Sequence, residues 1–242
     1  MRRTLQTLLA VSILSLSVAP AALAAPDEQD DLDELQGKLG NEWVQVKNDR
    51  LRNIKTFAKQ EDGKRYRSFK VEAELEGTAE AGARVLLDFD NYGKWYWEVL
   101  SSKLLRRVSP TEYYMYMVHR APGGLPNRDV ILHATVEPQA KGKNYLLLRV
   151  KAVADYMEPK PPLVRMPAED MTVKFTPRTG NKVQVEAEGY IDPGGKVPTW
   201  AINFIQRSAP YSVMVGLQRM MRLDEYSKAK TPLPFPVYDA GR

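Results

Sequence analysis

The chain has 242 residues, with 35 Lys or Arg, 30 Asp or Glu, and a formal net charge of +5. A charge this small gives no argument for a nucleic-acid partner. The absence of cysteine excludes disulfides and metal sites built on thiolates. An apolar fraction of 43% allows one large or two small domains with a real core.

The first 24 residues have the three parts of a secretory signal peptide. Arg2 and Arg3 are basic, residues 5–18 are apolar, and residues 22–24 (Ala-Leu-Ala) have the small residues of a cleavage site. The apolar run is too short to span a bilayer, and a retained membrane anchor is the alternative interpretation. The pattern predicts cleavage after Ala24 and a periplasmic or secreted protein.

A helix, a hairpin and a second helix are expected next. Apolar residues at helical spacing predict the first helix: Leu32, Leu35, Leu39, Trp43 and Val46. Residues 54–59 and 66–76 have strand-like patterns on either side of Asp62-Gly63, which is a strong hairpin signal. Thr78, with Glu80 following, is typical of the N-cap of a helix that leads into an aromatic cluster at residues 92–97.

A meander of strands separated by turn residues fills the middle of the chain. The strands are predicted at residues 103–108, 112–120, 128–137, 145–154, 169–176 and 182–191. Gly and Pro clusters such as Ala121–Pro126 lie between them. No internal repeat is evident. Because the strands follow one another with turns between them, they should form one antiparallel sheet.

A long helix is predicted from Pro198 onward, after a turn at residues 192–195. One apolar stripe follows helical spacing: Ile202, Ile205, Ala209, Val213, Gly216, Leu217, Met220 and Leu223. Gln206 and Asp224 are the only polar residues that fall within that stripe. Pro210 predicts a kink near residues 206–210. Residues 231–242 contain three alternating prolines and should form an extended tail.

This order of elements indicates an α+β fold in a single domain over residues 25–230. The sheet has one apolar face that needs a cover, and the final helix is the element long and apolar enough to provide it. A curved sheet that grips a helix leaves a cavity between the two.

Three local motifs resemble the START (StAR-related lipid-transfer) domain family, a helix-grip family of the Bet v 1-like superfamily. The first is Asp90 with Trp95, and the second is Pro126-Asn127-Arg128-Asp129-Val130. The third is the entry to the last helix, residues 192–203 (DPGGKVPTWAIN). The resemblance covers roughly residues 30–225. The chain departs from the family pattern at Tyr96, which replaces an acid, and at Asn127, which is inserted.

The resemblance implies a helix-grip fold, with a curved antiparallel sheet around the C-terminal helix and an internal apolar cavity. It also implies that Arg128 can point into the cavity and meet a polar ligand head. Arg128 shares its strand face with apolar residues, and guanidinium suits phosphate or carboxylate. The alternatives are an ion pair with Asp129 or another carboxylate, and exposure at the strand end.

Further residues are predicted to contact a ligand or a membrane. Tyr114, Met115, Tyr116 and Met117 form an aromatic and methionine-rich strand, which suits flexible apolar ligands, although ordinary core packing is the alternative. The other candidates are Trp95, Trp97, Trp200, Phe204 and Met214. Trp200 and Phe204 lie on the outer face of the last helix and could enter a membrane surface.

Catalysis has no support in the sequence. His119 and His133 lie on different predicted strands without the spacing of metal ligands, so no metal site is expected. No G-x-S-x-G, P-loop or Rossmann motif is present, and no catalytic residue or cofactor is predicted.

These observations predict a monomeric, non-catalytic protein that binds and carries a hydrophobic lipid in the periplasm, with transient membrane contact. The first alternative is a helix-grip enzyme, such as a cyclase or hydrolase, that acts on an apolar substrate. The second is a lipid sensor that acts through a protein partner.

Overall fold

The computed structural model describes residues 40–240. The predicted signal peptide and most of the predicted first helix lie outside these residues. Val46, at the end of that predicted helix, lies in strand β1 (Val44–Asp49). The helix prediction is therefore wrong at this point, because β1 pairs with β2 as the edge of the sheet and its Val residues suit a pleated surface.

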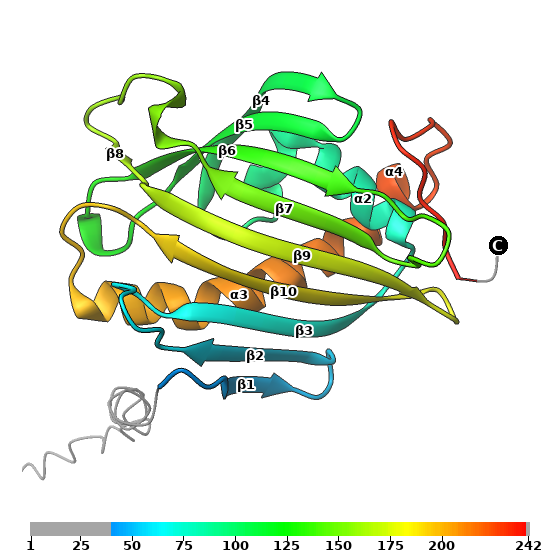
Figure 1. Cartoon of the computed structure of the whole chain (residues 1–242), viewed down its shortest axis with the longest axis horizontal. Helices are drawn as coiled ribbons and strands as arrows, with labels where there is room; N and C mark the ends of the chain where they lie inside the picture. The colour runs from blue at the N-terminus through cyan, green and yellow to red at the C-terminus, as the bar shows by residue number, and fades with distance from the viewer. Residues whose placement is uncertain (1–39, 241–242) are drawn as a thin grey trace, which may run out of the picture. The chain divides into compact units, whose positions relative to one another are not determined.

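Ten strands form one sheet (Figure 1). After β1 they are β2 (Ile54–Lys59), β3 (Ser68–Glu76), β4 (Val99–Ser109), β5 (Glu112–His119), β6 (Arg128–Glu137), β7 (Leu146–Ala152), β8 (Val164–Arg165), β9 (Ala168–Arg178) and β10 (Lys182–Asp192). The order is β1-β2-β3-β10-β9-β7-β6-β5-β4, with antiparallel neighbours, and the short β8 pairs with β6 in parallel. The predicted hairpin and meander of strands are confirmed.

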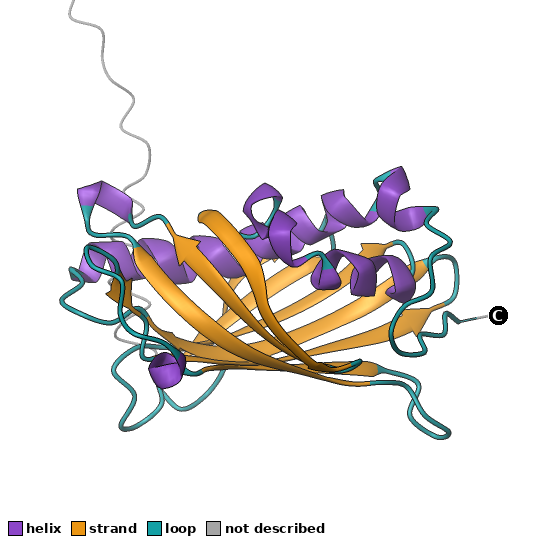
Figure 2. Cartoon of the chain, turned by 90° about the horizontal axis from the view of Figure 1, so that it is seen from above, coloured by secondary structure: helices purple, strands orange, loops and turns teal. Residues whose placement is uncertain are grey.

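The helices α2 (Ala79–Leu87) and α3 (Thr199–Met221) lie against one face of the curved sheet (Figure 2). The short helix α4 (Asp224–Ser227) follows α3. Residues 40–240 also contain three 3₁₀ helices: η1 (Phe89–Lys94), η2 (Pro122–Gly124) and η3 (Ala154–Tyr156). The predicted α+β helix-grip architecture is thereby confirmed. No helix within residues 40–240 is both long and apolar enough to cross a membrane.

Local signals in the sequence explain where α2 and α3 begin. The Oγ1 atom of Thr78 accepts a hydrogen bond from the backbone N–H of Ala81, at 3.0 Å, which is the predicted N-cap of α2. Before α3, the backbone N–H of Gly194 donates to Oδ1 of Asp192, at 2.8 Å. Gly194 has a φ of 69°, which favours glycine, so this turn directs the chain from β10 into α3.

Helix α3 is continuous through Pro210. Its second half is packed into the core, and an added Cβ at Gly216 would collide with the backbone oxygen of Trp95. Leu223 lies beyond the end of α3 and is exposed, so its place in the predicted buried stripe is wrong. The reason is that the helix ends at Met221 and the chain turns into α4.

Residues 228–240 contain no helix or strand and lie on the domain beside α2 and α4 (Figure 1). Phe235 is buried in the core, and Oδ1 of Asp239 accepts a hydrogen bond from the backbone N–H of Ala79, at 2.7 Å. Gln139 and the backbone of Tyr238 exchange two hydrogen bonds. The proline-rich segment is thus part of the packed structure.

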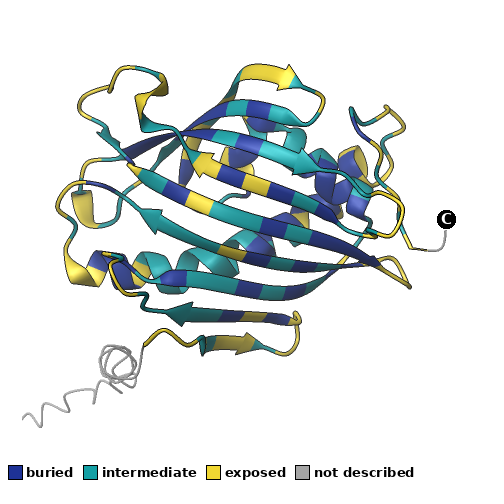
Figure 3. Cartoon of the chain, viewed as in Figure 1, coloured by how far each residue is buried: buried dark blue, intermediate teal, exposed yellow. Residues whose placement is uncertain are grey.

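Buried and exposed residues alternate along the strands, so buried positions form bands across the sheet (Figure 3). In β10, for example, Val183, Val185 and Ala187 are buried and point toward the helices. Glu188 is exposed on the opposite face. The core therefore lies between the inner face of the sheet and the helices.

Candidate functional site

A cavity lies between the inner face of the sheet and α3. Its volume is about 160 Å³. This is close to the roughly 150 Å³ of an engineered apolar cavity that stays dry and binds benzene.

The lining of the cavity is predominantly apolar. The central strands contribute alternate residues, among them Tyr113, Met115, Met117, Leu132, Ala134, Val136, Leu148, Val173 and Phe175. Helix α3 contributes Ile202, Ile205, Ala209, Val213, Met214 and Leu217 from its predicted stripe and beside it. A surface of this kind favours an apolar ligand, because each buried CH₂ contributes roughly 0.8 kcal/mol.

Four of the residues predicted from the sequence meet at this cavity. Trp95, Met115, Met117 and Met214 all contribute to its lining and are buried. They come from four places: the end of η1, two positions of β5, and the second half of α3.

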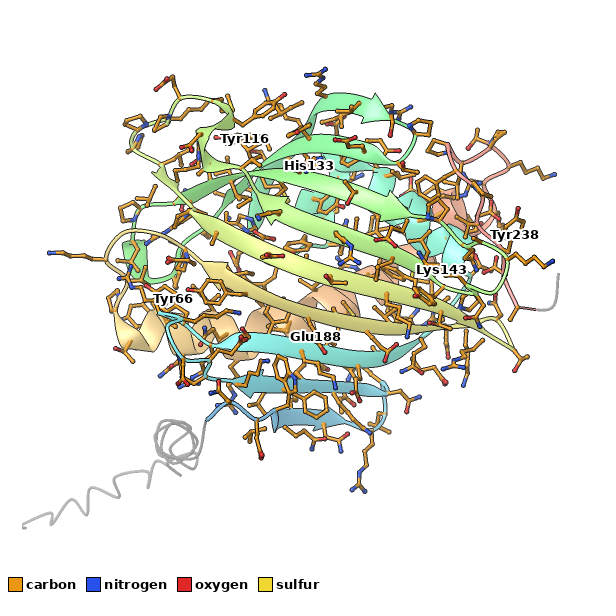
Figure 4. All side chains as sticks on the ribbon, in the orientation of Figure 1. Tyr66, Tyr116, His133, Lys143, Glu188 and Tyr238 are labelled. Carbon is orange, nitrogen blue, oxygen red and sulfur yellow. The ribbon has the colours of Figure 1, made fainter. Side chains whose placement is uncertain are left out.

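Tyr114 and Tyr116 do not line the cavity, and their prediction as ligand-binding residues is corrected. Because side chains alternate along β5, both point to the outer face of the sheet. The ring of Tyr114 stacks on those of His133 and Tyr156, with centroids 4.6 Å apart in each case. The hydroxyl of Tyr116 donates to Oδ2 of Asp129, at 3.0 Å. Figure 4 shows Tyr116 and His133 on the face away from α3.

Arg128 is buried at the start of β6 but does not line the cavity. Its Nη1 donates to the carbonyl oxygen of Pro126, and its Nε donates to that of Pro193, at 3.4 Å. Burial lowers the pKa of the Arg128 guanidinium, and no carboxylate within residues 40–240 forms an ion pair with it. Arg128 therefore ties the loop before β6 to the turn before α3, which differs from the expected head-group contact.

Asp129, the alternative ion-pair partner predicted for Arg128, pairs with Arg165 instead. Its carboxylate pairs with the guanidinium of Arg165, with both N–O distances at 3.0 Å. This ion pair is buried on the outer side of the sheet, where it holds β8 beside β6.

Trp97, Trp200 and Phe204 form an aromatic patch outside the cavity. The ring centroids of Trp97 and Phe204 are 6.0 Å apart, and Trp200 is packed over Gly123 of η2. Trp200 is 48% exposed and Phe204 50% exposed. None of the three lines the cavity, so their prediction as ligand-binding residues is corrected. Trp200 and Phe204 point outward from the first turns of α3, and Trp97 lies between η1 and β4. They remain candidates for contact with a membrane.

Glu169 is a cavity residue that the sequence analysis missed. It is only 2% exposed, and its Oε1 has no hydrogen-bond partner within residues 40–240. Burial raises the pKa of this carboxyl to about 7. Glu169 alternates with Met171, Val173 and Phe175 along β9, so the period of two in the predicted strand was a signal that could have placed it inside.

Two more polar residues line the same end of the cavity. The Nε2 of Gln206 donates to the backbone oxygen of Arg67, at 3.3 Å, and its Oε1 is buried without a partner within residues 40–240. The guanidinium of Arg67 is half-buried, and burial lowers its pKa. The sequence indicated Gln206 as an unusual position, since this polar residue interrupts the apolar stripe of α3.

The two histidines lie on different strands, β5 and β6, as predicted, and their environments differ. Burial lowers the pKa of His119 to about 4. His133 shares a hydrogen bond of 2.8 Å with Oε1 of Glu112 on the outer face. No group of three or more His, Cys, Asp or Glu residues that could hold a metal ion occurs within residues 40–240.

The model of the START domain family matches residues 27–227. The chain belongs to the START domain family. The crystal structure of a STAR-related lipid transfer protein fragment from Xanthomonas axonopodis is similar, with a TM-score of 0.68 and 29% identity. The comparison covers 75% of this chain and 99% of that fragment.

A second solved structure has a similar fold, and a sequence relative is also found. Human STARD10 has a TM-score of 0.65 and 21% identity, over 87% of this START protein and 84% of the human chain. An uncharacterized protein of Pseudomonas aeruginosa is 22% identical over 180 residues, which are 74% of this chain and 87% of the relative. Family membership, together with the apolar cavity, supports lipid binding by this START domain.

Proposed function

We propose that this protein carries a hydrophobic lipid through the periplasm and releases it unchanged. The observation that carries the proposal is the apolar cavity between the sheet and α3. The similar fragment from Xanthomonas axonopodis is described as a lipid transfer protein, which supports the same activity. The signal-peptide pattern of residues 1–24 supports the periplasm as its location.

A carrier of this kind solves a physical problem for its ligand. A 16-carbon chain costs on the order of 13 kcal/mol to expose to water, so it leaves a membrane slowly. A cavity that supplies apolar contacts lowers this cost during transfer. The cavity of about 160 Å³ is small for a long chain, so the first half of α3 moves outward when the ligand enters.

Transient contact with a membrane belongs to the same proposal. Trp200 and Phe204 of the aromatic patch are exposed at the first turns of α3, and the half-buried Trp97 packs against Phe204. Aromatic side chains at this position favour the boundary between head groups and acyl chains. Contact there would bring the bilayer to the part of α3 that covers the cavity, and one monomer is sufficient for this exchange.

One observation favours the enzyme alternative. Glu169 is a carboxyl group in an apolar cavity, and its pKa of about 7 is suited to a general acid or base. Turnover separates the two functions. Lipid that is recovered unchanged after repeated transfer favours carriage, and chemically altered lipid favours catalysis.

The proposal is tested by purifying the protein from the periplasm of its own host and measuring it by native mass spectrometry. We expect about one lipid per protein, and transfer of this lipid between vesicles. Empty protein throughout would contradict the proposal.

A cavity-filling variant provides the control. Ala209→Phe places a ring in the cavity and should reduce the bound lipid, whereas Ser208→Phe makes the same change one position along α3, outside the lining. Equal lipid content in the two variants would show that the lipid binds elsewhere.

A further inference from the structure

The polar lining of the cavity is gathered at one end. Glu169, on β9, is in register with Ile191, on β10. The pairing of β10 with β3 ends at Tyr190 and Ser68, so Arg67 is the next residue along, beside Ile191. All three side chains line the cavity, with Glu169 and Arg67 on either side of Ile191. Two strand spacings, roughly 10 Å, therefore separate the two charged residues.

Gln206 covers this row from the other side. Its side chain reaches from α3 to the backbone of Arg67. Its Oε1 is, with Oε1 of Glu169, one of two buried acceptors in the described cavity lining that have no partner within residues 40–240. The group of Glu169, Arg67 and Gln206 is called the polar row below. It lies under the first half of α3, away from the buried second half.

The polar row is not explained by packing. A buried acceptor without a donor destabilises a fold, and Glu169 has no ion pair with any described cation. Burial raises the pKa values of the Tyr92 and Tyr96 phenols, and the charge of Glu169 adds to the shift in both. A polar ligand head could form hydrogen bonds with all three groups of the polar row: the unpaired oxygens of Glu169 and Gln206, and the half-buried guanidinium of Arg67.

Beyond the polar row, the same face of β9 is apolar. Met171, Val173 and Phe175 follow Glu169 at alternate positions, and all three line the cavity. From Glu169 to Phe175 the strand rises by roughly 20 Å. The cavity thus has a polar end and a long apolar wall.

We propose that the polar row binds the head group of the carried ligand, with Glu169 accepting a hydrogen bond and Arg67 binding an oxygen acceptor. The ligand class is an amphiphile whose head carries a hydroxyl or ammonium donor, together with a carbonyl or anionic oxygen within roughly 10 Å. The inference rests on the proposed function and assigns the head group to residues other than Arg128.

Two isomeric probes test the role of Glu169. Decan-1-ol and 1-methoxynonane have the same atoms, but only the alcohol can donate a hydrogen bond. Binding is measured through displacement of an environment-sensitive fluorescent fatty acid from the full-length mature protein. We expect the wild type to bind the alcohol roughly tenfold more tightly than the ether.

Variants of Glu169 assign this preference to its side chain. In Glu169→Leu the two probes should bind alike, with the affinity for the ether retained. Glu169→Gln keeps an acceptor oxygen and should keep part of the preference. Glu188→Leu is the matched control, since it alters an exposed carboxylate on the outer face of the neighbouring strand. Figure 4 shows Glu188 on that outer face.

Arg67 is tested with decanoate, which offers an anionic oxygen. Arg67→Met should weaken decanoate binding roughly tenfold and leave the affinity for 1-methoxynonane unchanged. Lys70→Met serves as the control, because Lys70 lies near the start of β3 and forms an ion pair with Glu72. Unchanged decanoate binding in Arg67→Met would remove Arg67 from the proposal.

The outcomes separate this inference from the proposed function. Equal affinity of the wild type for the two isomers overturns the head-group role of Glu169, while lipid carriage stands. Failure of the wild type to bind either probe counts against lipid carriage itself. The comparison of the isomers needs no variant, so it holds even if a substitution at Glu169 prevents folding.

Discussion

The two halves of α3 differ in how they are held. In the second half, Met214, Gly216, Leu217, Met220 and Met221 are buried. In the first half, burial is limited to residues 201–203, and none of residues 204–213 is buried. The second half is anchored in the core, and the first half covers the cavity with few fully buried side chains.

Two polar contacts tie the first half of α3 to the sheet. Gln206 donates to the backbone of Arg67, and the hydroxyl of Tyr211 donates to Oδ2 of Asp49, at 2.7 Å. Elements with few buried apolar contacts open at a lower free energy than the rest of a domain. We therefore expect a ligand to enter the cavity through opening of the first half of α3, while the second half keeps the fold intact.

The largest expected effect is at the anchored end of the cavity, beside α2. Phe235→Ala removes a buried ring that also lines the cavity, and should lower the free energy of unfolding by about 3 kcal/mol. Urea unfolding measures the loss. Tyr238→Ala, in the same segment but exposed, is the control and should change stability by less than about 0.5 kcal/mol. Equal effects of the two variants would contradict the role of Phe235.

Glu169, on β9 beneath the first half of α3, should give the free energy of unfolding a pH dependence of nearly the same size. Its folded-state pKa, about 7, is above the ordinary value of 4.5 for a glutamate carboxyl, so the folded state holds the proton more strongly. Stability from this group is full below pH 4.5 and is lost as the pH rises through 7, by roughly 3 kcal/mol in total. Glu169→Gln should remove this loss.

The measurement is urea unfolding of the wild type and Glu169→Gln at pH 4 and pH 8. The variant should be more stable than the wild type at pH 8, with a smaller difference at pH 4. Identical pH dependence in both proteins would exclude Glu169 as its source.

A smaller loss is expected from Gly216→Ala in the second half of α3. The new methyl group would collide with the backbone of Trp95 and force the helix away from η1, at a cost of about 2 kcal/mol. Ser208→Ala, in the first half, should have an effect below about 0.5 kcal/mol. If both variants have the stability of the wild type, the contrast between the two halves is wrong.

The smallest effect on stability belongs to the aromatic patch, where the change should appear in membrane binding instead. A Trp200→Ser, Phe204→Ser double variant should bind vesicles of phosphatidylethanolamine and phosphatidylglycerol about tenfold more weakly, with unfolding changed by less than about 1 kcal/mol. Cosedimentation measures the binding, and Tyr238→Ser is the control. Undiminished binding of the double variant would leave the patch without this role.

The sequence predicted the sheet, α3 and the family, because each depends on periodicity and on turn residues that are local. The face of β5 that lines the cavity was not predictable in this way. Tyr113 to Met117 are all apolar or aromatic, since the outer face is also covered, in part by Tyr156. Where both faces of a strand are covered by other groups, the sequence pattern does not show which face points into the cavity.

Among single residues, Arg128 shows the same limit, whereas Glu169 does not. The parity of Arg128 correctly placed it on the inner side, but its carbonyl partners come from the loop before β6 and the turn before α3. Such partners depend on how the chain folds over distance. For Glu169, parity alone was sufficient, and the strand pattern contained the information.

The place of β3 in the sheet also determines when the protein can fold. Glu76 of β3 pairs with Lys182 of β10. The first strands to be synthesised therefore cannot join the rest of the sheet until β10 has been synthesised. Phe235, near the end of the chain, adds the final piece of cavity wall. Contacts this far apart in sequence slow folding. The apolar inner face is therefore complete only after synthesis of nearly the whole chain, and until then it depends on protection from aggregation.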